Sequence, residues 1–257
     1  MLDQITPVVL TRDEEPNIER TLGALAWARD IIVVDSFSTD ATVELARRFP
    51  NVRVLQRELD TLAGQSTFGI EQARTPWVLL IDADYFVPPD FVEELRSLDP
   101  PANVRGFRGA FRYAVNGRPL RASLYPPRVV LLDRDYARVW QDGHTPRVLI
   151  DGETRDLRSR LIHDDRKSFA RFLARQKKYM RQEAEKLRTA DLRALNLAAR
   201  IRKLVVVAPF AVVIHTLFVK GVILDGWPGL RYVWERFVAE LILSRELLGV
   251  RRQSRRS

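Results

Sequence analysis

Two aspartates one residue apart, Asp82 and Asp84, are the residues of this chain best suited to chemistry. They follow the apolar run Trp77-Val78-Leu79-Leu80-Ile81, which is typical of a buried strand, so both carboxylates are expected at the point where a strand gives way to a loop. Carboxylates in such a position can bind Mg²⁺ or Mn²⁺ together with diphosphate oxygens. The ion would act as a Lewis acid on a departing nucleotide diphosphate. We therefore expect a divalent-metal site at Asp84 and Asp82.

The first hundred residues alternate between short apolar runs and amphipathic stretches. The expected strands are Ile5–Thr11, Ile31–Asp35, Val52–Gln56 and Trp77–Asp82, and the expected helices lie near Asn17–Trp27, Thr39–Phe49 and Gly64–Ala73. This alternation, with nearly unbroken Val, Ile and Leu strands, predicts an α/β fold whose mostly parallel sheet is covered on both faces. Ligands of open α/β sheets bind beyond the carboxyl ends of the strands, so Asp35 is expected to face the same crevice as Asp82. For Ser38-Thr39-Asp40, helix capping is an equally good interpretation.

The pattern changes after Pro88-Pro89-Asp90. Three shorter strands, interrupted by Gly and Pro, are expected at Gly106–Val115, Arg128–Asp133 and Arg147–Ile150, where the acceptor side of a site would be built. A strongly basic helix is expected over Arg166–Arg188, with apolar residues at helical spacing, which is typical of an ordinary packed helix with a solvated face.

The C-terminal region combines apolar runs with basic residues. Leu204–Val219 has His215 as its one ionisable group, falls short of the roughly 20 residues that span a bilayer, and contains Pro209. A second apolar helix, Leu230–Leu248, carries several charges, so two helices lying in the membrane interface are favoured over two spanning helices. The basic tail after Gly249 would then meet an anionic membrane surface. A buried helical hairpin or a homo-oligomer interface is the alternative.

The charge and cysteine content of the chain restrict the classes of partner that it can bind. The chain carries 42 Lys and Arg against 33 Asp and Glu, a net charge of +9, which suits an anionic partner. No helix-turn-helix, zinc-finger or RNA-binding signature is recognisable, so we expect no nucleic acid partner. The absence of cysteine excludes thiolate chemistry and Cys-ligated zinc. Since Met1–Gln4 shows no basic region followed by an apolar run, we expect no signal peptide and a location on the cytoplasmic face of the cell inner membrane.

The sequence resembles the family 2 inverting glycosyltransferases with a GT-A fold, especially their lipopolysaccharide-core glucosyltransferase-like branch. The matching segments are Val8–Glu15 with Asn17-Ile18, Ile31–Ser36 with Ser38–Thr42, Trp77–Asp84, Tyr125–Arg128, Trp140, His144, His163, Gln176–Tyr179, Lys220-Gly221 and Leu224–Gly226. The resemblance implies a GT-A nucleotide-diphospho-sugar transferase domain over residues 1–164. Basic connecting helices would follow over 165–203, and a C-terminal helical membrane-associated appendage over 204–257.

The resemblance also implies residue roles. A donor-binding set is expected to hold the nucleotide sugar: Thr11 and Glu14 bordering the nucleoside, Asp35 at the base or ribose, Asp82 at the ribose or a metal-bound water, and Arg128 at phosphate or sugar. Asp84 would bind the metal. An inverting displacement needs a general base, for which Asp142 is the first candidate and His144 the second. His144 could equally be a third metal ligand or a structural histidine.

The implied activity is transfer of a hexose, with UDP-sugar the favoured donor, to a lipid-linked or glycolipid acceptor in bacterial envelope glycan synthesis. The chain departs from similar family members at Gln65-Ser66-Thr67, at Tyr85 and at Thr145, where those members often have Gln-Arg-Asn, Glu and Glu. These departures leave two alternatives open. One is a polyprenyl-phosphate sugar synthase, whose phosphate acceptor needs little base catalysis. The other is a catalytically degenerate binding or assembly subunit.

Overall fold

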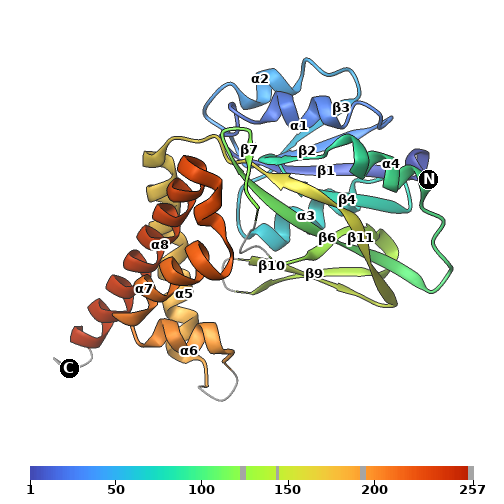
Figure 1. The fold of residues 1–257 in the computed structure, drawn as a ribbon. Coiled ribbons are helices and arrows are strands. Elements are labelled where there is room, and N and C mark those ends of the chain that lie inside the picture. Colours follow the sequence, from blue (N-terminus) through green and yellow to red (C-terminus); the bar gives the residue numbers. More distant parts are fainter. Residues whose placement is uncertain (122–125, 143–144, 192–194, 254–257) are drawn as a thin grey trace. The chain divides into compact units, whose positions relative to one another are not determined.

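The computed structural model describes residues 1–121, 126–142, 145–191 and 195–253 (Figure 1). The chain divides into two compact units. The first comprises Met1–Pro119 and Tyr125–Arg166, and the second comprises Leu120–Leu124 and Lys167–Ser257.

The first unit begins with four parallel strands. Their order across the sheet is β3 (Val52–Gln56), β2 (Ile31–Asp35), β1 (Ile5–Thr11) and β4 (Trp77–Asp82). Every residue of β1 and β2 is buried, as expected for continuous apolar strands inside a covered sheet. Successive side chains point to opposite faces, so Val9 packs in the core cluster of one face and Val8 in the cluster of the other.

Helices cover both faces of this sheet. Ile18 and Leu22 of α1 (Ile18–Ala24) lie in the same core cluster as Val9, together with residues of α2 (Thr42–Ala46) and α4 (Pro89–Ser97). Ile70 of α3 (Leu62–Glu71) lies in the cluster that contains Val8. The α/β architecture predicted from the sequence is therefore confirmed.

The sheet becomes mixed beyond β4. It continues through β8 (Arg128–Asp133), β6 (Val104–Val115), β11 (Glu153–His163) and β5 (Tyr85–Phe86), with β7 (Arg118–Pro119) paired to β6. Within the described residues, β6 and β11 are the one parallel pair among these neighbouring strands, and the other pairings are antiparallel. The parallel arrangement is thus confined to the first four strands and to this pair. A second sheet consists of the antiparallel strands β9 (Ala137–Asp142) and β10 (Thr145–Ile150).

The second unit is helical. It contains α5 (Phe169–Thr189), α6 (Leu197–Lys203), α7 (Val207–Ile214), a π-helical turn His215–Val219, a 3₁₀ turn Val222–Asp225 and α8 (Gly226–Gln253) (Figure 1). Ala184 and Leu187 of α5 pack against Leu243 of α8. Pro209 lies in the first turn of α7, where a missing N–H costs no helical hydrogen bond. Pro209 is therefore accommodated within α7 and does not interrupt it.

Candidate functional site

The carboxyl ends of three parallel strands meet at one edge of the sheet. The last residue of β1, Thr11, is in register with Asp35 at the end of β2, and Leu10 is in register with Asp82 at the end of β4. The backbone continues this alignment beyond the strands, because Ala83 N donates to Leu10 O at 3.0 Å. The structure thus brings together Thr11, Asp35 and Asp82, as the pattern of the sequence predicted.

Asp35 is fully buried and accepts several hydrogen bonds. Its carboxylate accepts from Ser38 N at 3.0 Å, from Ser38 Oγ and from Gln56 Nε2 at 3.0 Å. The intervening residue, Phe37, has a φ of 55° and a side chain that is 50% exposed. A non-glycine residue in the left-handed region is uncommon and is often found at functional sites, since the surrounding contacts must hold it there. Asp35 therefore fixes a tight loop that presents an aromatic ring to solvent.

The loop after β1 is joined to the loop after β2. Asp13 N donates to Ser38 Oγ at 2.8 Å, and Thr39 N donates to Asp13 Oδ1 at 2.8 Å. Asp13 has a φ of 52°, so both loops hold a left-handed residue at the same edge. Asp40 accepts from Thr42 N at 3.1 Å, just ahead of α2. Asp40 thus holds the turn just before α2, whose N-cap residue is Ala41 and has no side-chain cap.

Thr11 and Glu14 are both buried at this edge. Glu14 N donates to Thr42 Oγ1 at 2.7 Å, and the Glu14 carboxylate accepts from Asn17 Nδ2 at 2.8 Å. Thr11 Oγ1, by contrast, has no hydrogen-bond partner within the described parts of the chain. A buried hydroxyl without a partner is rare in folded proteins and points to a bound water or ligand. Among the described residues, the Thr11 hydroxyl group therefore remains available to hydrogen-bond a ligand or a water molecule.

Asp82 forms an ion pair across the sheet with Arg128. Arg128 Nη2 donates to Asp82 Oδ2 at 3.0 Å, and both side chains keep partial access to solvent. The guanidinium lies 5.1 Å from the ring centre of Tyr85 and 5.2 Å from that of Phe111, so aromatic faces hold it in place. Arg128 thus lies beside the strand-end carboxylates, in reach of an anionic ligand bound there.

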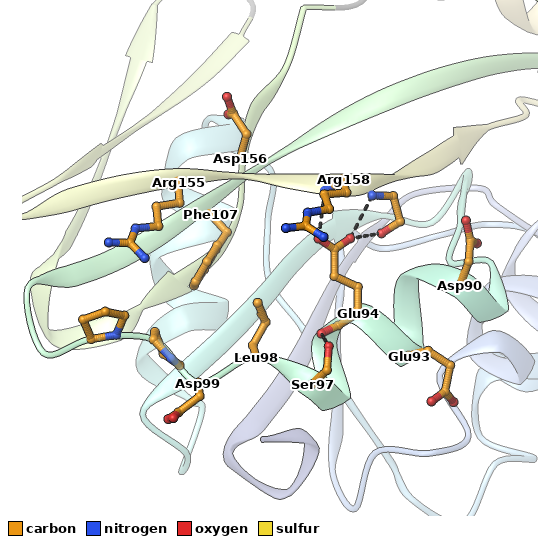
Figure 2. A pocket seen from close by; sticks show the side chains of 13 residues that line it. Asp90, Glu93, Glu94, Ser97, Leu98, Asp99, Phe107, Arg155, Asp156 and Arg158 are labelled. Atoms are coloured by element: carbon orange, nitrogen blue, oxygen red, sulfur yellow. Dashed lines mark hydrogen bonds between the residues drawn. The ribbon is translucent and has the colours of Figure 1, made fainter.

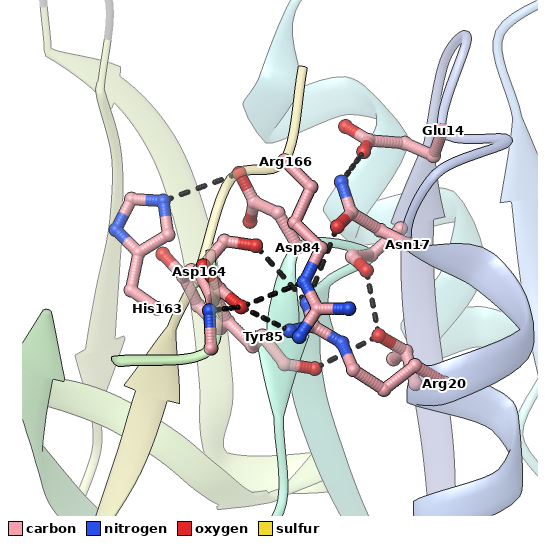
Figure 3. A network of polar contacts seen from close by, with 11 residues as sticks. Glu14, Asn17, Arg20, Asp84, Tyr85, His163, Asp164 and Arg166 are labelled. Carbon is pink, nitrogen blue, oxygen red and sulfur yellow. Dashed lines mark hydrogen bonds and ion pairs between the residues drawn. The ribbon is translucent and has the colours of Figure 1, made fainter. Parts of the chain in front are cut away.

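Asp84 contacts a histidine at the end of another strand. His163 Nε2 lies 3.2 Å from Asp84 Oδ2 (Figure 3). Because β11 pairs with both β5 and β6, His163 stands opposite Tyr85 on one side and Tyr113 on the other, and both rings meet the imidazole edge-on. Asp84 and His163 are each 7% exposed, so the expectation that Asp84 lies at an exposed strand end was wrong.

A buried network of polar side chains supports this pair (Figure 3). The Asp164 carboxylate accepts from Arg20 Nη1 at 2.6 Å, from Arg166 Nε at 2.8 Å and from Gly117 N at 2.9 Å. Asp164 N donates to Asp84 O at 3.1 Å, which joins the network to the Asp84 loop. Burial lowers the pKa of Arg20, although the neighbouring Asp164 favours its charged form. The network therefore fixes the chain on both sides of the Asp84–His163 contact.

The network also reaches the donor-binding candidates. Arg20 Nη2 donates to Asn17 Oδ1 at 3.2 Å, and Asn17 in turn donates to Glu14. Glu14 at the end of β1 and His163 at the end of β11 are thereby held through one continuous set of hydrogen bonds and ion pairs.

The two base candidates are placed differently. Asp142 ends β9 on the second sheet, where its carboxylate pairs with Arg147 Nε at 3.3 Å. The neighbouring Gln141 accepts from Ala63 N at 3.0 Å, which fastens this sheet to α3. Asp142 therefore lies on a different sheet from Asp82 and Asp84. His144, the second candidate, falls outside the described residues.

The site has two side chains suited to a divalent ion. Within the described residues, no group of three or more His, Cys, Asp or Glu side chains lies close enough to hold a metal. Asp84 and His163 nevertheless offer a carboxylate and an imidazole within 3.2 Å of each other, beside the backbone of Asp82. Mg²⁺ and Mn²⁺ in phosphate-transfer sites use one or two protein carboxylates and fill the remaining positions with substrate oxygens and water. The donor set fits such an ion, and the imidazole favours Mn²⁺ over Mg²⁺.

A separate pocket of about 780 Å³ lies toward the beginning of β11 (Figure 2). Its lining includes Glu94 of α4, Phe107 of β6 and Arg155 of β11. The Glu94 carboxylate accepts from Arg158 N and Ser159 N, each at 2.8 Å. His163 closes the other end of the same strand, so this pocket is distinct from the strand-end site.

Two important residues, His163 and Asp164, were given no role by the sequence interpretation. They end a strand, Glu153–His163, that is rich in charged residues and shows no clean alternation of apolar and polar positions. A histidine followed by two aspartates after such a segment is the signal that could have identified them. Phe37 was also missed, because an aromatic residue in a short loop has no local pattern that marks it.

The sequence comparisons concern the N-terminal part of the chain. Residues 7–100 match the model of glycosyl transferase family 2. The lipopolysaccharide core biosynthesis glycosyltransferase LpsC of Rhizobium meliloti is 30% identical over 84 residues, which are 31% of this chain and 31% of that protein. An uncharacterized glycosyltransferase of Rickettsia typhi is 30% identical over 95 residues, 37% of this chain and 32% of that protein. The matched part thus spans about a third of the length of these curated relatives.

Solved structures of low sequence identity also align with the chain. The S. aureus TarS fragment 1–349 in complex with UDP-GlcNAc is 12% identical, with 97% of this chain and 92% of that chain covered and a TM-score of 0.49. Glucosyl-3-phosphoglycerate synthase of Mycobacterium tuberculosis, in complex with Mn²⁺ and UDP-glucose, is 22% identical. This alignment covers 43% of this chain and 44% of that chain, with a TM-score of 0.37.

Proposed function

Because residues 7–100 form a domain of glycosyl transferase family 2, we propose that the chain transfers a hexose from a nucleotide-diphosphate sugar to a lipid-linked or glycolipid acceptor. UDP-sugar is the proposed donor, and the proposed location is the cytoplasmic face of the cell inner membrane. The observation that carries the proposal is the gathering of Asp35, Asp82 and Asp84 at one sheet edge, with His163 against Asp84. The similarity to the lipopolysaccharide core biosynthesis glycosyltransferase LpsC favours a glycolipid acceptor.

The nucleoside of the donor is assigned to the ends of β1 and β2. Thr11 Oγ1 is buried and has no partner among the described residues, so a ligand hydroxyl or base nitrogen would satisfy it. Asp35 lies in register with Thr11 and would accept from the base or ribose. Phe37, exposed between Asp35 and Ser38, offers a ring on which the base could stack. Glu14 borders this position from the following loop.

The diphosphate is assigned to the ends of β4 and β11. Asp84 and His163 would hold Mg²⁺ or Mn²⁺, with Asp82 contributing through the ribose or a bound water. When bound, the ion neutralises charge on the leaving diphosphate. Arg128 supplies a second, fixed positive charge beside Asp82 and would exchange this partner for a phosphate oxygen.

The reaction is an inverting displacement. The acceptor hydroxyl oxygen forms a bond to the anomeric carbon while the bond from that carbon to the diphosphate oxygen breaks. The electron pair of the broken bond leaves with the nucleoside diphosphate, and the hydroxyl proton passes to a general base. Asp142 is the proposed base, with His144 as the alternative. Arg147 Nε lies 3.3 Å from the Asp142 carboxylate and would orient it.

A panel of nucleotide sugars tests the proposal directly. The purified full chain is incubated with each donor, Mn²⁺ and a glycolipid extract, and release of nucleoside diphosphate and labelling of lipid are both measured. Activity with one donor that is lost in Asp84→Asn supports the proposal. Tight donor binding without turnover in any acceptor mixture would instead identify a binding or assembly subunit. Labelling of polyprenyl phosphate alone would identify a polyprenyl-phosphate sugar synthase.

A further inference from the structure

The second unit exposes large apolar side chains along one continuous path. On α7 and the turn after it, Val206, Phe210, Ile214 and Phe218 recur every four residues and are each 58–69% exposed. On α8, an apolar residue recurs every seven positions, at Trp227, Trp234, Leu241 and Leu248, with 44–74% exposure. We call these eight residues, together with Val207, Val219, Ile223, Leu224 and Leu230, the apolar face. Isolated exposed apolar residues are ordinary, but a contiguous face of this size marks an interaction site.

The same helices bury charged groups on their other side. Glu235 and Glu240 of α8 are each 7% exposed. Arg202 Nε donates to Glu240 at 2.9 Å, and Arg231 Nε donates to Glu235 at 3.3 Å. Ser244 Oγ, also buried, donates to Val205 O at 2.6 Å. The inner side of α8 thus holds these paired polar groups beside apolar residues such as Leu243, while Trp227 and Trp234 are exposed. An apolar outer surface with polar groups paired inside is the arrangement expected where the outer surroundings are hydrocarbon.

The length and bend of these helices suit shallow insertion into a bilayer better than crossing it. Within the described residues, no single helix is both long and apolar enough to cross a membrane. Val207–Val219 and Val222–Gly249 meet that requirement of length and composition only as a pair, and the pair is bent by 71°. The break between the two elements falls at Lys220 and Gly221, and the Gly221 φ of 69° suits glycine. Exposed residues continue through this bend, at Val219, Ile223 and Leu224.

We infer that the apolar face is a docking surface for a lipid bilayer with anionic headgroups, into which α7 and α8 sink along one side. The distribution of charge along the chain favours an anionic bilayer as the partner. Residues 167–257 hold 20 Lys and Arg against seven Asp and Glu, a net +13, so residues 1–166 carry −4 of the total +9. Two exposed cations adjoin the apolar face along the chain: Lys220 follows Val219, and Arg245 lies one turn from Leu241 on α8. Anionic headgroups attract such residues.

A second copy of the chain is the competing occupant of this face. Pairing two copies would bring together two segments 167–257, each of net charge +13, which repel each other. A bilayer buries the same apolar side chains and supplies the opposite charge, so it satisfies both features of the surface. The inference goes beyond the proposed function, because docking on lipid requires neither a donor nor turnover.

Vesicle flotation tests the inference with the full chain. We expect the protein to float with vesicles of phosphatidylcholine and phosphatidylglycerol, and to float less with phosphatidylcholine alone or at high salt. The variant Trp227→Gln/Trp234→Gln removes two exposed rings and should lower the partition coefficient by about 10-fold to 100-fold. Trp140→Gln is the matched control, since Trp140 is 49% exposed but lies on β9 in the first unit. Brominated lipid should quench the fluorescence of Trp227 and Trp234, and the double variant should lose that quenching.

Two results would overturn the inference. One is failure of the folded parent to float with anionic vesicles. The other is equal flotation of the parent and the double variant. A molar mass by light scattering that falls from dimer to monomer in the double variant, without flotation of the parent, would assign the face to a second copy. Asp84→Asn should float like the parent, so loss of transfer in that variant concerns the proposed function alone.

Discussion

His163 Nε2 lies 3.2 Å from Asp84 Oδ2, and this contact joins the end of β11 to the loop that follows β4. The two residues are 79 positions apart in the sequence, and each is 7% exposed. A carboxylate and an imidazole held this close are either a buried hydrogen-bonded pair or a pair of metal ligands. The distinction is open to experiment, because removing one ligand weakens metal binding whereas removing a purely structural partner does not.

We predict that His163→Gln weakens Mn²⁺-dependent binding of UDP by at least about 10-fold to 100-fold, the range seen when the support of a metal ligand is lost. Isothermal titration calorimetry with and without Mn²⁺ measures the effect. His215→Gln is the control, since His215 is exposed on the second unit. Equal metal-dependent affinity of the parent and His163→Gln would rule out His163 as a ligand and leave it a structural role.

Asp35→Asn should weaken donor binding by about 1 to 3 kcal/mol, the range for a lost hydrogen bond to a charged group. The Michaelis constant for the acceptor should change little. Because the Asp35 carboxylate also accepts from Ser38 and Gln56, the stability of the variant must be measured alongside nucleotide affinity. Asp40→Asn serves as the comparison, since Asp40 accepts from the start of α2. Unchanged nucleotide affinity in Asp35→Asn would restrict Asp35 to holding its loop.

The parallel half of the fold was predictable from the sequence because local signals agree there. The strands at 5–11, 31–35, 52–56 and 77–82 have the predicted bounds, since each is a short, mostly apolar run bounded by polar residues. Because these strands run parallel, their C-terminal residues Asp35 and Asp82 must lie at the same edge of the sheet. Helix ends were less predictable. The helix expected over 39–49 occupies only Thr42–Ala46, because the Asp40 contacts hold the preceding residues in a loop.

The mixed half of the fold depends on contacts that are distant in sequence. The strand Glu153–His163 was not expected, because five of its eleven residues are charged: Glu153, Arg155, Asp156, Arg158 and Arg160. It is held by pairing with β6, by ion pairs such as Arg108–Asp156, and by the Glu94 carboxylate. No local pattern encodes those partners. The metal-ligand candidate His163 was missed for the same reason.

Asp142→Asn should lower the turnover rate by about 10²-fold to 10⁴-fold with donor binding retained, if Asp142 removes the acceptor proton. Arg147→Gln is the matched variant, because it removes the partner of Asp142 and leaves the carboxylate in place. The turnover rate of Arg147→Gln should fall much less than that of Asp142→Asn. Steady-state rates at saturating donor and acceptor, together with calorimetric donor affinities, separate catalysis from binding. Full activity of Asp142→Asn would transfer the base assignment to His144.

Glu94 should make stability depend on acid pH. Burial alone would raise the pKa of Glu94, but hydrogen bonds from Arg158 N, Ser159 Oγ and Ser159 N lower it below its ordinary value (Figure 2). A carboxyl whose pKa is lower in the folded state stabilises that state above its unfolded pKa of about 4.3. This contribution is lost as the pH falls through the lower, folded pKa.

We therefore predict that Glu94→Gln lowers the free energy of unfolding near neutral pH by about 1 kcal/mol, after allowing for solvent screening. The difference from the parent should shrink below about pH 4. Urea unfolding over a series of pH values measures it. Glu93→Gln is the control, because Glu93 forms only an exposed ion pair with Arg96 at 3.5 Å. A difference that stays constant with pH would contradict the linkage.

Asp164→Asn should be the most destabilising of these substitutions. The Asp164 side chain is 1% exposed, and its charge balances the guanidinium groups of Arg20 and Arg166. The amide would leave both cations without that compensation, at a cost of about 3 to 5 kcal/mol for a broken buried pair. Asp156→Asn is the matched control, since Asp156 and its partner Arg108 are 62% and 48% exposed, and the expected loss is about 0 to 1 kcal/mol. Urea midpoints of the two variants give the comparison. Similar losses in both would mean that the buried network adds no more stability than a surface ion pair.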